Sequence, residues 1–244
     1  MNSKLIVLAV VSFLGLSAQA QIGKQLMNKG KELTGTGGDS KTALTKDEVV
    51  SGLKEALTRG SETSAKAASV VDGFNGNSLI RIPWPAEAQA MKDKLIKLGM
   101  EKKVQEFELS INRAAEEAAK EAYPIFVTAV KEMTVTDGFA ILNGGDTAAT
   151  HYLRTTTTSP LTVKFSPIVK AAMDKVQVTA YWTPLVTTYN KIPGVVKQNP
   201  DLEKYVTAKA IDGLMLLISQ EEARIRKDPA AQVSELLKKV FGGK

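Results

Sequence analysis

The residues best suited to chemistry are carboxylates, arginines and one amide, spaced as if they lie on helices. Asn112, Arg113 and Glu116 share one short stretch, and Asp212 and Glu221 share another. A polar site between helices could be built from them, with carboxylates serving as general acid and base in a hydrolase. The remaining candidates for such a site or polar network are Arg81, Arg154, Lys209, Glu222, Arg226 and Asp228.

A structural interpretation of the same residues competes with the catalytic one. Glu116 follows Arg113 by three residues and Glu222 precedes Arg226 by four, spacings at which opposite charges pair on one helix face. Only six of the 32 basic residues are arginines, and Arg suits fixed pairing whereas Lys suits a solvated surface. We therefore favour structural ion pairs that orient helices and satisfy helix caps.

Other catalytic classes lack the residues that they need. The chain has no Cys and a single His, His151, which excludes thiol nucleophiles, thiolate zinc sites and His-rich metal sites. It has no Gly-x-Ser-x-Gly, His-Glu-x-x-His or Walker motif. Paired carboxylates could bind a divalent cation, but no EF-hand spacing occurs. We expect no cofactor and no metal, and the balance favours a protein that is not an enzyme.

Helices are expected to position these residues, because apolar side chains recur at three- and four-residue steps without strand alternation. The strongest stripe covers residues 101–133, where Pro124 should kink or break the helix. Asp201 opens a long helix to about Lys227, and its apolar run from Leu214 to Ile218 predicts a buried, central position. The predicted fold is all-α: a single orthogonal multi-helix bundle around this C-terminal-half helix, with no substantial sheet.

Shorter elements are expected around these two helices. In chain order they are a capped helix at 45–71, an apolar loop at 72–85 that packs onto the core, a helix at 85–99, short helices at 136–143 and 146–154, a loop at 155–158, a helix at 159–176 and a last helix at 228–241. Residues 178–190 fit either a helix or a strand-like structure, because Pro184 interrupts both patterns.

The first twenty residues predict a secretory signal peptide. Lys4 precedes an apolar stretch from Leu5 to Leu16, and a small-x-small pattern ends at Ala20. The stretch is shorter than the about 20 apolar residues of a membrane span. We expect cleavage after Ala20 and a periplasmic location. No Cys follows the cleavage point, so a lipoprotein anchor is not expected.

Behind the signal peptide, residues 21–44 predict a flexible leader, and residues 45–244 predict a single helical domain. Residues 21–46 hold five Lys against one Glu and one Asp, whereas residues 47–244 hold 26 basic and 24 acidic residues. The basic leader could make weak contact with an anionic membrane surface. The nearly neutral domain argues against a nucleic-acid partner, and no transmembrane span is expected in it.

A series of short motifs runs through nearly all of residues 50–243. They are Gly73-Phe74, Arg81-Ile82-Pro83, Phe107-Glu108, Asn112–Glu116, Met133-Thr134, Ile141–Gly144, Ala148–Thr150, Arg154, Tyr205–Ala210, Asp212–Leu214, Glu221-Glu222, Ile225–Pro229 and Val240–Gly242. The series resembles an exported bacterial family known as domain of unknown function 4197. The resemblance implies a mostly helical periplasmic protein of Gram-negative bacteria, and it implies no activity. Gly138 departs from the family pattern, which has Ala there.

Three functions follow as hypotheses. The favoured one is an exported, non-enzymatic protein that binds an envelope protein or another envelope component. The second is a carrier of a lipid or other apolar ligand in a cavity between helices, suggested by the small side chains within residues 101–133 and by the apolar loop at 72–85. The third is a hydrolase that uses Glu116, Asp212 or Glu221.

Overall fold

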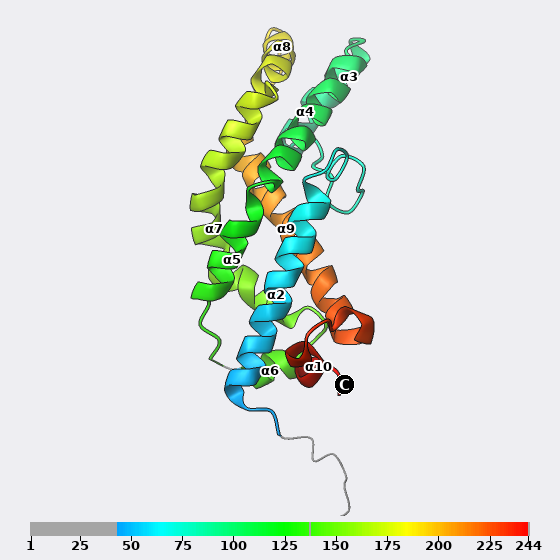
Figure 1. The fold of residues 1–244 in the computed structure, drawn as a ribbon. Coiled ribbons are helices and arrows are strands. Elements are labelled where there is room, and N and C mark those ends of the chain that lie inside the picture. Colours follow the sequence, from blue (N-terminus) through cyan, green and yellow to red (C-terminus); the bar gives the residue numbers. More distant parts are fainter. Residues whose placement is uncertain (1–42, 137, 244) are drawn as a thin grey trace, which may run out of the picture. The chain divides into compact units, whose positions relative to one another are not determined.

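Helices make up most of residues 43–136 and 138–243, which are the residues that the computed structural model describes (Figure 1). The α-helices are α2 (Lys46–Ala68), α3 (Gln89–Lys97), α4 (Glu101–Ala119), α5 (Ala122–Glu132), α6 (Gly138–Asn143), α7 (Ala148–Lys175), α8 (Val178–Asn190), α9 (Leu202–Lys227) and α10 (Glu235–Phe241). Two 3-10 turns, η1 (Ala86–Ala88) and η2 (Pro229–Ala231), complete the order. These residues contain no strand, so the all-α prediction is confirmed. The predicted signal peptide and nearly all of the predicted leader lie outside the described residues.

Helix α9 lies at the centre, packed against α2, α4, α7 and α10 (Figure 1). Leu214, Met215 and Ile218 are almost fully buried, as expected for an apolar run in a central helix. Gly213 lies under the ring of Phe74, and a Cβ atom at this position would approach the ring to 2.9 Å. The helix therefore forms the core that the C-terminal pattern predicts.

The predicted break at Pro124 is confirmed. Helix α4 ends at Ala119, and α5 begins at Ala122, so Pro124 occupies the first turn of α5. The missing N–H of proline is harmless there, because amides of a first turn have no intrahelical partner. The alanines of the predicted stripe are buried and allow close packing of neighbouring helices: Ala114, Ala115, Ala118, Ala119 and Ala122.

Helix α7 corrects one prediction. Residues 155–158 form no loop, and a single helix runs from Ala148 to Lys175 across Pro160 and Pro167. Its buried residues recur every four positions through both prolines: Leu153, Thr157, Leu161, Phe165 and Val169. Threonine hydroxyls in this region donate to carbonyls four residues earlier, as Thr156 does to Tyr152 at 2.8 Å. Burial of this face outweighs the local signals for a break.

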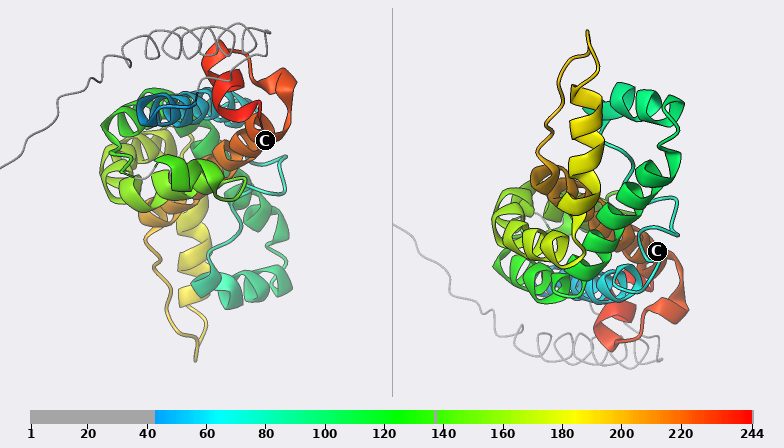
Figure 2. Two further views of the ribbon diagram at one scale, coloured as in Figure 1. Left: turned by 90° about the horizontal axis from the view of Figure 1, so that it is seen from below. Right: turned by 90° about the horizontal axis from the view of Figure 1, so that it is seen from above.

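The ambiguous segment at 178–190 is also helical. Trp182, Leu185 and Tyr189 form the buried face of α8, which packs against α3 and α4. Trp182 and Trp84 both contact Phe107, each with ring centroids 4.8 Å apart from it. Figure 2 shows that α3, the start of α4 and α8 extend together on one side of the bundle.

The predicted last helix is divided in two. Pro229 begins only the 3-10 turn η2, and Ser234 caps a separate helix, α10, by accepting from the N–H of Leu237. At the other end of the sequence, the predicted capping box of α2 is present: Thr45 Oγ1 accepts from the Glu48 N–H at 3.2 Å, and Glu48 accepts from the Thr45 N–H at 3.0 Å. No helix among residues 43–136 and 138–243 is long and apolar enough to cross a bilayer.

Candidate functional site

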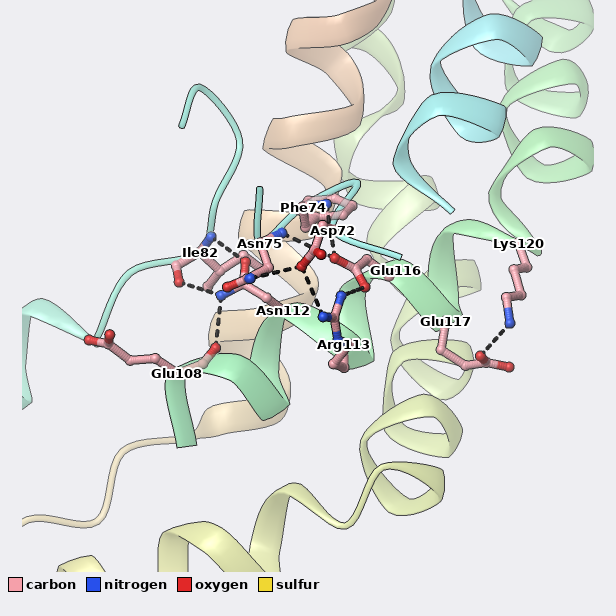
Figure 3. Close-up of polar contacts among 10 residues, drawn as sticks. All are labelled: Asp72, Phe74, Asn75, Ile82, Glu108, Asn112, Arg113, Glu116, Glu117 and Lys120. Carbon is pink, nitrogen blue, oxygen red and sulfur yellow. Dashed lines mark hydrogen bonds and ion pairs between the residues drawn. The ribbon is translucent and has the colours of Figure 1, made fainter. Parts of the chain in front are cut away.

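The carboxylate of Glu116 anchors the loop that follows α2 (Figure 3). Its Oε1 accepts the backbone N–H groups of Phe74 and Asn75, each at 3.1 Å, and its Oε2 lies 2.6 Å from Arg113. Arg113 also donates to Asp72 at 2.9 Å, and Asp72 has a left-handed φ of 65°. The buried carboxylate thus has both oxygens engaged and its charge paired, which suits a structural anchor.

The charges of this cluster stabilise one another. The hydrogen bond from Asn75 and then the one from Arg113 lower the pKa of Asp72 below its ordinary value. The bond to Glu116 is the main cause that raises the pKa of Arg113. The opposite charges of Asp72 and Arg113 are therefore both favoured by their pairing, which helps to hold the loop in one conformation.

Asn112 and Tyr205 anchor the later part of the same loop. Asn112 is fully buried; its Oδ1 accepts the N–H of Ile82 at 2.8 Å, and its Nδ2 donates to the Ile82 carbonyl at 2.9 Å (Figure 3). Tyr205 donates to the carbonyl of Pro83 at 2.9 Å, and burial raises the pKa of its hydroxyl to about 12. The loop consequently packs onto the core as predicted, with Phe74 and Ile82 buried.

Glu222 forms a second buried anchor, at the start of α7. Its two oxygens accept the N–H groups of Ala149 at 3.0 Å and Thr150 at 2.7 Å. Arg226 donates to the same carboxylate at 2.8 Å and to the carbonyl of Leu142 at 2.8 Å. The guanidinium also lies 5.5 Å from the ring centroid of Phe241. An anion at a helix N-terminus is favourable, and here a side chain of α9 supplies it.

The other predicted site residues are more exposed and lie in separate contacts. Arg154 pairs with Asp212, and Glu221 pairs with Arg224 at 2.7 Å. Arg81 lies 3.7 Å from Glu108. Lys209 and His151 are exposed. Asp228 caps η2 by accepting from the Ala230 N–H. The structure therefore does not bring the predicted carboxylates into one cleft.

This arrangement gives no support to a carboxylate-dependent hydrolase. Glu116, Asp212 and Glu221 each pair with a different arginine, and these three pairs are separate from one another. Two carboxylates in contrasting environments would be needed on either side of a scissile bond. Among residues 43–136 and 138–243, no group of three or more His, Asp or Glu side chains is placed to hold a metal ion.

A groove of about 310 Å³ lies between α5 and α7. Its floor is mostly apolar and consists of Ile125, Ala129, Met133 and Leu161, together with Thr157, which is also buried. Polar groups surround the floor: Glu132, Thr134, Tyr152, Thr156 and Lys164. Pro160 also lines the groove and has no N–H, so the Thr156 carbonyl lacks its usual partner four residues on. An apolar floor with a few polar groups is typical of a small-molecule site.

The sequence-based candidates included none of the residues that line this groove. Two signals were available: Pro160 interrupts the hydrogen bonding of a helix, and Ala129 is small enough to leave space opposite it. Neither signal says that α5 and α7 are neighbours, which only the packing reveals. The predicted apolar loop at 72–85 does not line the groove.

The comparison with family models finds one family over most of the chain. The family model described as Protein of unknown function (DUF4197) matches residues 43–242. The chain belongs to this family. No curated protein and no solved structure matches the chain. The DUF4197 match covers both anchors and the groove. The family description gives no activity for any of them.

Proposed function

We propose that this protein is exported to the periplasm of a Gram-negative bacterium and is a non-enzymatic binding protein for a small anionic amphiphile. The α5–α7 groove carries the proposal, because it combines an apolar floor with a polar rim. Its volume of about 310 Å³ lies at the lower end of the range for small-molecule sites, about 300 to 1,000 Å³. A ligand of that size has a short apolar body and one head group.

The rim favours a negatively charged head group. Lys164 lies 3.8 Å from Glu132, and both side chains are about half exposed or more. Such a loose, solvated pair contributes little free energy, so a ligand carboxylate could take the place of Glu132 beside Lys164 at small cost. The apolar body would then lie on Ala129 and Leu161, where removal of its surface from water provides the affinity.

The buried carboxylates support a non-enzymatic function. Glu116 and Glu222 each satisfy two backbone amides and one arginine. A general acid or base must exchange a proton with the substrate. Both oxygens of each carboxylate already accept hydrogen bonds from the protein, so neither carboxylate is placed to do this. The sequence also lacks the nucleophile motifs of common hydrolases, and its signal-peptide pattern supports the proposed export.

Calorimetric titration with decanoate tests the ligand class. We expect the wild-type protein to bind decanoate, and Ala129→Leu to weaken binding at least tenfold by filling the floor. Ala171→Leu is the matched control, because Ala171 lies on the exposed face of α7. Lys164→Gln should weaken binding of decanoate but not of decanol. Equal affinity in the wild type and Ala129→Leu, or no binding by the wild type, would contradict the proposal.

Export is tested separately by sequencing the N-terminus of the protein recovered from the periplasm. The signal-peptide pattern predicts Gln21 as the first residue. A chain that stays in the cytoplasm and begins at Met1 would overturn the location without affecting the groove.

A further inference from the structure

Two turns project at the end of the extension formed by α3, α4 and α8 (Figures 1 and 2). One turn joins α3 to α4, and the other follows α8. Gly99 and Gly194, one in each turn, have a φ of +78°, and a Cβ atom at either position would meet nothing within 4 Å. We call residues 94–103 and 191–197 the tip. Most of its residues are exposed, and the exceptions are the buried Leu95 and the half-buried Met100, Ile192 and Val195.

The tip concentrates positive charge. It contains six lysines and one acidic residue, Glu101, which gives it a net charge of +5. All six lysines are exposed: Lys94, Lys97, Lys102, Lys103, Lys191 and Lys197. Residues 47–244 as a whole hold 26 basic and 24 acidic residues, so the rest of that range has a net charge of −3. The domain is nearly neutral overall, but its charge is distributed unevenly, with a positive tip and a negative remainder.

Apolar side chains lie among these lysines. Leu98 is 53% exposed, Ile96 is 37% exposed and Val196 is 77% exposed. Exposed apolar residues are unremarkable when scattered singly, but here they share two projecting turns with six lysines. Apolar groups that enter the acyl boundary beside lysines that meet lipid phosphates are the pattern of peripheral membrane attachment.

We propose that the tip docks on a bilayer that contains anionic phospholipid. The lysines supply charge complementarity to the phosphate head groups, and Leu98 and Val196 enter the boundary between head groups and acyl chains. This attachment is separate from the α5–α7 groove and from the leader at residues 21–44. It would hold the protein against a membrane without a spanning helix.

Vesicle co-sedimentation tests the proposal with the protein lacking residues 1–20. Vesicles of phosphatidylcholine alone are compared with vesicles of phosphatidylcholine and phosphatidylglycerol in equal parts. We expect binding only to the latter, and weaker binding as salt is added. The double variant Lys97→Gln, Lys197→Gln should lower the partition coefficient by about 25-fold, since each lysine near such a surface contributes about fivefold.

The control variant Lys46→Gln, Lys131→Gln removes the same charge from exposed positions outside the tip, at the first residue of α2 and in the last turn of α5. It should lower the partition coefficient less than threefold. Leu98→Ser should weaken binding, and Val163→Ser, at a 76% exposed position on α7, should not. All four variants change exposed side chains, and thermal melts verify their folding.

Three results would overturn the docking proposal. The first is no binding of the wild type to anionic vesicles, as expected if the tip instead meets an acidic protein. The second is an equal loss in both lysine variants, which would indicate net charge alone. The third is full binding by the tip variant, which would place the attachment in the leader. None of these results bears on binding of decanoate in the groove.

Discussion

Glu222 and Arg226 lie one turn apart on α9, and together they join α9 to α6 and α7. The Glu222 carboxylate accepts the first amides of α7, while Arg226 donates to that carboxylate and to the last carbonyls of α6. Both side chains are at least 94% buried. The pair thus satisfies the end of one helix and the start of the next with a single salt bridge.

Loss of the Glu222 charge should destabilise the fold severely. Glu222→Gln leaves the Arg226 guanidinium buried without a counter-charge, and breaking a buried pair costs about 3 to 5 kcal/mol. Urea denaturation gives the free energy of unfolding. The control is the neighbouring Glu221→Gln, which breaks a partly exposed pair with Arg224 and should cost about 1 kcal/mol or less. Similar losses in both variants would show that Glu222 is no anchor.

A methyl group at Gly73 should disturb the loop that Glu116 anchors. A Cβ atom there would lie 2.5 Å from the carbonyl oxygen of Ala68, a backbone atom that cannot move aside cheaply. We expect Gly73→Ala to cost about 1 to 3 kcal/mol of unfolding free energy. Gly145→Ala, where a Cβ would meet nothing within 4 Å, should change stability by at most about 0.5 kcal/mol. If chemical denaturation showed a larger loss of unfolding free energy for Gly145→Ala than for Gly73→Ala, the described loop conformation would be contradicted.

Acid should weaken the contact between α2 and α10. The hydrogen bond from Lys239 is the main cause that lowers the pKa of Glu48 from 4.5 to about 2. A depressed folded pKa stabilises the protein above the unfolded value, so this contribution is present above pH 4.5 and lost as the pH falls towards 2. The difference in Tm between wild type and Lys239→Gln should therefore shrink over that interval. Parallel Tm curves across the interval would contradict the assignment.

Local and periodic signals predicted most of the fold. The capping box at Thr45 and Glu48, the break at Pro124 and the central position of Leu214 to Ile218 all depend on nearby residues, and the structure confirms them. The continuity of α7 could not be predicted in this way. Pro160 favours a helix start locally, and burial of Leu161 and Phe165 against other helices decides otherwise.

The part of the site that depends on spacing along one helix could be predicted from the sequence. The part that depends on packing between helices could not. The pair of Glu222 and Arg226 follows from their spacing, and the structure confirms that they form a salt bridge. Their roles at the ends of α6 and α7 depend on tertiary packing, which spacing does not reveal. The groove is harder still to predict, because it is lined by residues of two helices, such as Ala129 of α5 and Pro160 of α7.

The most direct test of the proposed function is a methyl NMR titration of the wild-type protein with decanoate. The proposal predicts shifts confined to the floor of the α5–α7 groove, at the methyls of Ile125, Met133 and Leu161, while Leu98 in the tip stays unchanged. Shifts spread over the surface, or none at decanoate concentrations that saturate a small-molecule site, would contradict it.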